Sequence, residues 1–180
     1  MIILLLSLSI GCSSLFKGPR EQANDSIAEA NEAIEEHNQL FEEARATYDE
    51  AKEAIEENTT GEAPPEEEER ITETRTTMQE ARSRLAEARG PLSGVQDLDV
   101  EPEIKEYAGF LSEAIDAQLV AEDREIDFYE LLEQDPTLSE NREEALEILA
   151  EVGDGYEEAE NAYRRAQELA DANPELLRES

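Results

Sequence analysis

Few residues in this 180-residue chain have side chains that are commonly used in catalysis or metal binding. Cys12 is the only cysteine and His37 the only histidine, which excludes an internal disulfide and any metal site built from several cysteines. A di-iron carboxylate site needs a glutamate three residues before its histidine, but Ile34 stands there. The chain also lacks the Gly-x-Ser-x-Gly turn of many hydrolases and the glycine-rich loops that hold phosphates. We therefore expect no enzymatic activity, no metal and no other cofactor.

Apolar residues recur at heptad spacing in four segments, which predicts four long helices. In the first, residues 21–57, large side chains at the a positions alternate with smaller ones at d, and glutamates occupy the opposite side. The second is expected at residues 65–89, where Pro65 and a run of glutamates favour a helix start. In the first helix the a positions are Ile27, Ile34, Phe41, Tyr48 and Ile55, and the d positions are Ala30, His37, Ala44 and Ala51.

The third and fourth helices are expected at residues 103–134 and 139–172. The glycine and proline content of residues 90–102 predicts a linker before the third helix, and residues 174–180 form a C-terminal tail. Short connections of about 4 to 13 residues favour antiparallel neighbours. We therefore predict an all-α domain at residues 21–173, an antiparallel four-helix bundle with coiled-coil-like heptad packing.

Two glycines, Gly153 and Gly155, interrupt the fourth helix without shifting its heptads, which indicates close packing or a mild kink. The arginines at the edge positions of the second helix are expected to pair with glutamates on neighbouring helices. These arginines are Arg70, Arg75, Arg82, Arg84 and Arg89. The core positions of the fourth helix are expected to be Ala145, Leu149, Val152, Tyr156, Ala159, Tyr163 and Ala166, with Ile148, Gly155, Ala162 and Leu169 widening the apolar face.

Several polar residues fall at positions that should face the inside of this bundle. At a rise of about 1.5 Å per residue, His37 and Gln118 lie at mid-height of the first and third helices, level with Thr74 and Tyr156. These four residues predict a polar layer, which either fixes the register of the helices or lines a cavity for a small ligand or ion. Glu125 is another inward candidate, and an arginine of the second helix is its expected partner.

The formal net charge of −33 at pH 7 arises from 48 acidic and 15 basic residues. Such a surface repels nucleic-acid phosphates and attracts cations and basic proteins, so we expect no nucleic-acid partner. Acidic composition alone would also suit a disordered chain, but the regular apolar spacing favours a folded one. The excess of carboxylates is suited to high ionic strength, where their mutual repulsion is screened.

An uncharged apolar stretch, "IILLLSLSI", occupies residues 2–10. It is too short to span a bilayer and has the length of the apolar part of a secretory signal. Gly11 and Cys12 follow it, and residues 1–14 resemble the lipobox of bacterial and archaeal lipoproteins. Two features depart from the family pattern: Ser9 stands where a branched apolar residue is usual, and no lysine or arginine precedes the cysteine.

The resemblance implies that residues 1–11 are a signal peptide that is removed, and that Cys12 then carries at least two acyl chains, enough for stable anchoring. Residues 12–20 would be the tether. We therefore expect a secreted protein, anchored to the membrane by lipid on the extracytoplasmic side of the cell envelope. Its expected role is structural or in protein interaction, with another envelope protein as partner and no identified small molecule. The alternative is a ligand- or cation-binding lipoprotein that uses the polar layer or the acidic surface.

Overall fold

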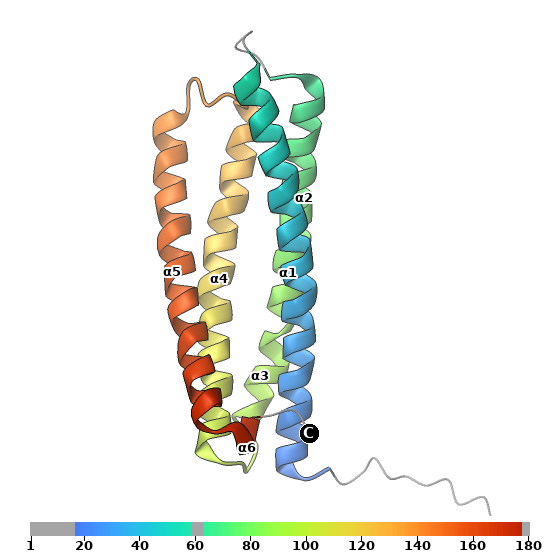
Figure 1. Ribbon diagram of the computed structural model, residues 1–180, viewed down its shortest axis with the longest axis vertical. Coiled ribbons are helices and arrows are strands. Elements are labelled where there is room, and N and C mark those ends of the chain that lie inside the picture. Colours follow the sequence, from blue (N-terminus) through green and yellow to red (C-terminus); the bar gives the residue numbers. More distant parts are fainter. Residues whose placement is uncertain (1–16, 59–62, 178–180) are drawn as a thin grey trace, which may run out of the picture.

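The computed structural model describes residues 17–58 and 63–177, and within these residues all regular secondary structure is helical. Two short helices lie near one end of an elongated bundle (Figure 1): α3 (Arg89–Val95) and α6 (Pro174–Leu177). The bundle itself is made of four long helices: α1 (Pro19–Glu57), α2 (Pro65–Glu87), α4 (Pro102–Gln134) and α5 (Arg142–Ala172). The prediction of an all-α fold with four long helices is therefore confirmed.

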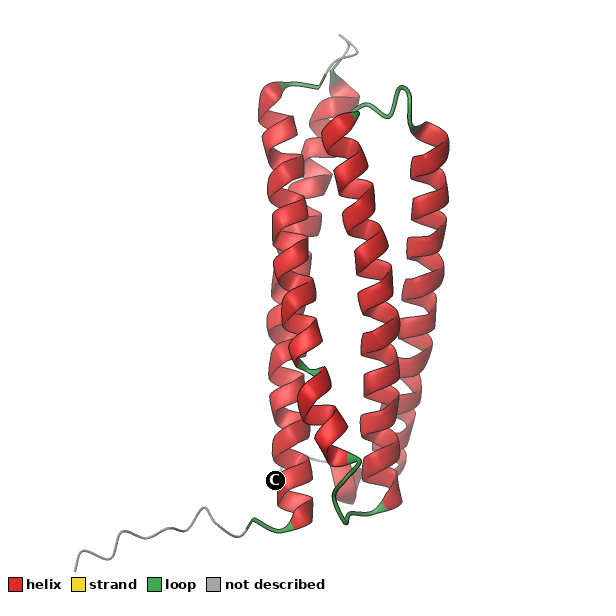
Figure 2. Ribbon diagram, turned by 180° about the vertical axis from the view of Figure 1, so that it is seen from behind, coloured by secondary structure: helices red, strands yellow, loops and turns green. Residues whose placement is uncertain are grey.

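The four long helices form two closely packed pairs. α1 packs mainly against α2, and α4 packs mainly against α5. Contacts between α2 and α4 join the two pairs, and contacts of α3 with α1 and with α4 add to them. The end of α1, the start of α2 and the α4–α5 connection lie at one end of the bundle, and α3 and α6 lie at the other (Figures 1 and 2).

Small side chains allow the close packing of α1 against α2. The fully buried residues of α1 follow one another at intervals of seven, and the larger apolar residues three or four positions away remain only partly buried. Alanine has no side chain beyond Cβ, so the two backbones can approach each other closely at these positions. The buried residues are Ala23, Ala30, His37, Ala44 and Ala51.

Ion pairs place α2 between α1 and α4. The five arginines that were predicted to pair with glutamates of neighbouring helices all form ion pairs there, two with α1 and three with α4, but two of the partners are aspartates. Arg89 lies at the start of α3 rather than in α2. The pairs are Arg70–Glu50 (3.2 Å), Arg84–Glu36 (3.6 Å), Arg75–Glu133 (2.8 Å), Arg82–Asp123 (2.5 Å) and Arg89–Asp116 (2.5 Å).

Two segments differ from the sequence-based expectation. The segment predicted as a linker, residues 90–102, contains most of α3, and the predicted tail contains α6. Pro91 stands in the first turn of α3, where a missing N–H is tolerated. Leu92 and Val95 follow at helical spacing and are completely buried in the core. Burial of these two side chains therefore outweighs the low helix propensity of the surrounding glycines.

α5 begins at Arg142, three residues later than predicted, because Asp135 organises the turn before it. The carboxylate of Asp135 accepts backbone N–H groups from Glu140 (2.7 Å), Ser139 (3.1 Å) and Asn141 (3.1 Å). These hydrogen bonds, led by the one from Glu140, lower the pKa of Asp135 below its ordinary value. Residues 139–141, which were expected in the first turn of this helix, therefore lie in the turn that precedes it.

The core face of α5 differs in part from the predicted one. Leu149 was expected in the core but is 42 % exposed, whereas Ile148 is buried. Small residues of α5 face α4, and an added Cβ at Gly155 would lie only 2.9 Å from Cβ of Ala121. Gly153 has open space around it. Close packing against α4 therefore explains why position 155 is a glycine, but it does not explain the glycine at position 153.

Candidate functional site

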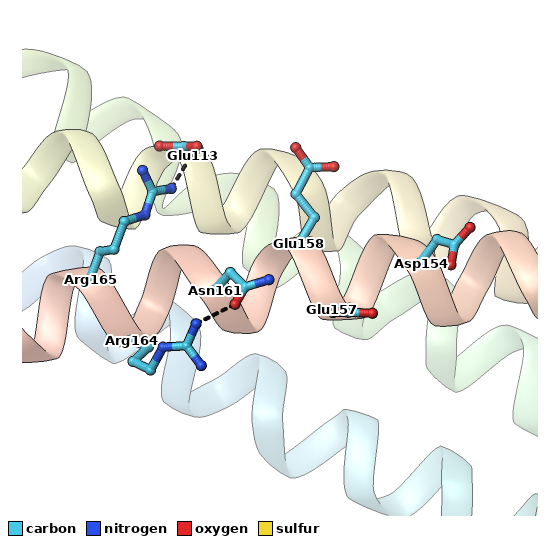
Figure 3. A pocket seen from close by; sticks show the side chains of 7 residues that line it. All are labelled: Glu113, Asp154, Glu157, Glu158, Asn161, Arg164 and Arg165. Atoms are coloured by element: carbon cyan, nitrogen blue, oxygen red, sulfur yellow. Dashed lines mark hydrogen bonds and ion pairs between the residues drawn. The ribbon is translucent and has the colours of Figure 1, made fainter.

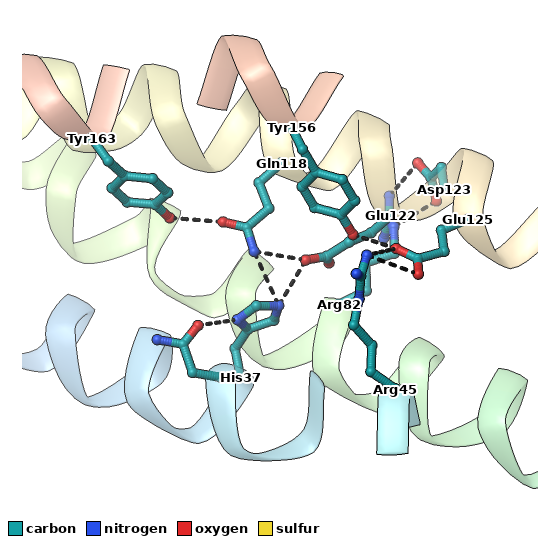
Figure 4. Close-up of polar contacts among 10 residues, drawn as sticks. His37, Arg45, Arg82, Gln118, Glu122, Asp123, Glu125, Tyr156 and Tyr163 are labelled. Atoms are coloured by element: carbon teal, nitrogen blue, oxygen red, sulfur yellow. Dashed lines mark hydrogen bonds and ion pairs between the residues drawn. The ribbon is translucent and has the colours of Figure 1, made fainter. Parts of the chain in front are cut away.

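A group of polar side chains, most of them buried or partly buried, lies between two apolar clusters of the core. One cluster includes Leu85, Ile104 and Leu111, and the other includes Met78 and Phe128. We call the group between them the polar centre (Figure 4). It consists of His37 and Arg45 of α1, Gln118, Glu122, Glu125 and Tyr129 of α4, and Tyr156 and Tyr163 of α5.

The contact between His37 and Glu122 joins α1 to α4. Nε2 of His37 lies 2.7 Å from Oε1 of Glu122, and both side chains are completely buried. On the other side of the ring, Nδ1 lies 2.9 Å from Oδ1 of Asn38. A buried polar pair is stable only when its hydrogen bonds are made, so this contact constrains how α1 and α4 are aligned.

Gln118 extends the network to α5. Its Nε2 donates a hydrogen bond to Oε1 of Glu122 (2.9 Å), and its Oε1 accepts one from the hydroxyl of Tyr163 (3.0 Å). Three helices are therefore connected through adjoining hydrogen bonds. Both donors to Glu122 reach the same oxygen, and its Oε2 is buried without a hydrogen-bond partner.

Glu125 accepts the hydrogen bonds of the other polar side chains of the polar centre, namely Arg45, Tyr129 and Tyr156. Arg45 donates through Nη2 to both of its oxygens, at 3.1 and 3.2 Å. The hydroxyls of Tyr129 (2.9 Å) and Tyr156 (2.5 Å) donate to one oxygen each. Both oxygens of Glu125 are thus satisfied, unlike those of Glu122.

Aromatic rings enclose the guanidinium group of Arg45. Its central carbon lies 4.7 Å from the centroid of the Phe41 ring and 5.5 Å from that of Tyr156. The Phe41 ring also lies 5.4 Å from the ring of His37 and meets Tyr156 edge-on at 5.9 Å. Two ring faces and a carboxylate therefore surround one flat cation.

The environment of the polar centre keeps its phenols neutral. Burial raises the pKa of Tyr156 and Tyr129 above the ordinary value, and the negative charge of Glu125 raises both further. Burial and the charge of Glu122 likewise raise the pKa of Tyr163. For Arg45, burial acts against the charged form, but attraction to Glu125 leaves its pKa above the ordinary value. The three tyrosines therefore serve as hydrogen-bond donors and Arg45 as a constant cation.

Three of the four residues predicted for a polar layer lie in the polar centre, namely His37, Gln118 and Tyr156. Thr74 does not. Because Arg84 of α2 pairs with Glu36, next to His37, Thr74 lies ten residues and about 15 Å further along α2. Its hydroxyl is buried there without a partner among the described residues.

The expected partner of Glu125 was wrong, and Glu122 was missed. An arginine of the second helix was expected, but Arg45 of α1 holds Glu125, while Arg75 and Arg82 of α2 pair with exposed or half-exposed carboxylates of α4. Glu122 follows Gln118 by four residues and therefore shares its helix face. That spacing was the one sequence signal that could have identified Glu122.

A surface groove lies apart from the polar centre. This groove of about 380 Å³ between α4 and α5 is lined by Glu113, Asp154, Glu157, Glu158, Asn161, Arg164 and Arg165 (Figure 3). Arg165 pairs there with Glu113 at 2.6 Å, and Arg164 donates to Asn161. Within residues 17–58 and 63–177, no three His, Cys, Asp or Glu side chains are placed to hold a metal ion together.

Comparison with known proteins yields no match to a protein family, a curated protein or a solved structure. The fold and site define the molecule as an elongated helical bundle with a buried polar centre. None of its described helices is both long enough and apolar enough to cross a membrane. Cys12 and the predicted signal peptide lie outside the described residues.

Proposed function

We propose that this protein is a non-catalytic, lipid-anchored helical bundle with a structural or protein-interaction role at the extracytoplasmic side of the cell envelope. The observation that carries the proposal is the sequence context of Cys12, an apolar stretch followed by glycine and a single cysteine. Acyl chains on Cys12 would tether the bundle to the membrane, and another envelope protein would be its partner.

The position of the tether suits a spacer that projects away from a membrane. α1 begins at Pro19, seven positions after Cys12, and its 39 residues extend for about 58 Å. An anchor at Cys12 would therefore attach the bundle by the end that holds α3 and α6. The opposite end, with the end of α1, the start of α2 and the α4–α5 connection, would then be available to a partner.

Within this proposal, the four long helices form an antiparallel bundle with coiled-coil-like heptad packing, and the polar centre selects its register. A polar layer in an otherwise apolar core disfavours any alignment that leaves its groups unpaired. Sliding α1 by one heptad would move His37 away from Glu122 and place an alanine beside it. The polar centre thus opposes sliding of the helices along one another.

Intact mass spectrometry tests the anchor. The full chain is expressed in a bacterium that processes lipoproteins, and the protein is extracted from its membranes. We expect the mass of residues 12–180 plus acyl chains, whereas a Cys12→Ser control should remain uncleaved and unacylated. An unmodified chain that retains residues 1–11 would contradict the proposal.

Crosslinking on intact cells tests the interaction role. Leu146 and Leu149 are exposed apolar residues one turn apart on α5, so a photoreactive residue at Leu149 probes a candidate contact surface. Glu157, exposed on the same helix, provides the matched control position. A crosslinked envelope protein specific to position 149 would support interaction, and its absence would leave the structural role alone.

A further inference from the structure

Glu122 has an unmet hydrogen-bonding requirement. Its side chain is completely buried and its Oε1 contacts His37 and Gln118, but Oε2 is buried without a donor. A carboxylate oxygen removed from water without a donor is unfavourable, and such atoms are normally satisfied by protein, water or a ligand. The polar centre therefore lacks one N–H or O–H donor at a defined position.

Arg45 occupies a place that suits a flat organic cation. Its guanidinium donates to both oxygens of Glu125 and lies against the rings of Phe41 and Tyr156. Aromatic faces combined with a carboxylate are the groups that recognise guanidinium and ammonium ligands. The two carboxylates lie on either side of the Tyr156 hydroxyl (Figure 4), and the charge of Glu122 acts on this phenol. Tyr156 is thus a shared neighbour of Arg45, which lies over its ring, and of Glu122, whose charge acts on its hydroxyl.

This place is accessible from solvent. The side chain of Arg45 is 48 % exposed, although its guanidinium lies over the ring of Tyr156 on α5. Rotation about its side-chain bonds would move the guanidinium into water without displacing a helix. The space that it leaves would be bounded by Phe41, Tyr156 and Glu125.

We propose that the polar centre binds a small organic cation with a guanidinium or primary amine group, and that Arg45 is the resident group which this ligand displaces. The cationic group of the ligand lies between Phe41, Tyr156 and Glu125. A further N–H of the ligand donates to Oε2 of Glu122. This site does not depend on the lipid anchor, so it stands or falls separately from the proposed function.

Agmatine, with one guanidinium and one primary amine, is a suitable probe. Its binding to the full chain is measured by titration calorimetry in mild detergent at constant ionic strength. The variants are Arg45→Ala, the double variant Arg45→Ala with Glu125→Gln, and Arg165→Ala as the matched control. Arg165 also lies against a ring, 4.7 Å from the Phe110 centroid, and pairs with Glu113, but it is outside the polar centre.

We expect Arg45→Ala to bind agmatine at least about tenfold more tightly than the unmodified chain, because the competing side chain is gone. Arg165→Ala should match the unmodified chain, and Glu125→Gln should abolish the gain. His37 is the only histidine, so its ring NMR signals report directly on the polar centre. They should shift when agmatine saturates the unmodified chain, a measurement that remains informative even if a variant fails to fold.

Equal affinity of Arg45→Ala and the unmodified chain would overturn the proposal. An equal gain for Arg165→Ala, or binding that leaves the His37 signals unchanged, would show attraction to the acidic surface and would also overturn it. A high-resolution crystal structure with a water molecule bound to Oε2 of Glu122, together with no saturable agmatine binding, would show that this oxygen is satisfied by an internal water. That result would reject the ligand site.

Discussion

Replacing Gly155 by alanine should destabilise the protein, whereas the same replacement at Gly153 should stabilise it. Both glycines lie in the interior of α5, two residues apart, so the gain in helix propensity is the same for both, about 1 kcal/mol. Their surroundings differ. An added Cβ at Gly155 would lie 2.9 Å from Cβ, 3.3 Å from Cα and 3.5 Å from N of Ala121, and at Gly153 it would meet nothing within 4 Å.

The size of the effect follows from these distances. The Cβ and backbone of Ala121 cannot rotate away, so α5 must shift relative to α4 to relieve the contact. Overpacking of this kind costs about 1–3 kcal/mol. Gly153→Ala should therefore raise the free energy of unfolding by about 1 kcal/mol, and Gly155→Ala should change it by about 0 to −2 kcal/mol.

Urea unfolding followed by far-ultraviolet circular dichroism, at constant salt, measures both variants against the parent chain. The difference between the two variants isolates the steric cost, because the propensity term cancels. Equal stabilisation by both replacements would refute the close contact between α4 and α5 at Gly155. Destabilisation by Gly153→Ala would refute the open surroundings inferred for that residue.

Three further predictions concern the polar centre, the tyrosines and the start of α5. Glu122→Ala should lower the free energy of unfolding by about 1–3 kcal/mol because it removes the carboxylate that contacts the buried ring of His37. Urea titration should show the double variant His37→Leu with Glu122→Leu to be more stable than Glu122→Ala, and a less stable double variant would contradict this. Burial raises the pKa of Tyr48 to about 12, so the folded chain retains a proton that the unfolded chain releases near pH 10. Stability should therefore be insensitive to Tyr48 below pH 10, and between pH 10 and about 12 this group alone should lower it by up to about 1.4 kcal/mol per pH unit. Tyr129, Tyr156 and Tyr163, whose pKa values are also raised, should steepen the fall, and urea midpoints that stay constant across this window would disprove it. Asp135→Ala should lower the free energy of unfolding by about 1 kcal/mol because three backbone N–H groups before α5 lose their acceptor. Unchanged stability together with unchanged amide hydrogen exchange in this turn would argue against such a cap.

The helices could be predicted from sequence because their signals are local. Heptad spacing and the proline at the start of α2 act within a few residues, so each of the four long helices was located to within a few positions. The ion pairs of α2 were also predictable, since residues beside the core face must meet whichever helix packs next to it. α3 was missed because its glycines and proline indicate a linker, and only burial of Leu92 and Val95 shows otherwise.

The core face of α5 illustrates a choice that periodicity leaves open. Its apolar residues form a wide band, and both Ile148 and Leu149 are compatible with a heptad pattern. Which edge of the band is buried depends on how the helix is rotated against α4. The tight contact of Gly155 with Ala121 sets that rotation, and Leu149 is consequently left partly exposed.

The sequence by itself determined the helical class, the approximate helix bounds, the acidic surface and the inward position of His37, Gln118 and Glu125. Only the tertiary structure decided which of these residues meet. Contacts between helices depend on their order around the bundle and on their axial offset, and each residue of error moves a side chain by about 1.5 Å and turns it by about 100°. An axial error of about ten residues separated Thr74 from the polar centre, and the order of the helices concealed the pairing of Arg45 with Glu125.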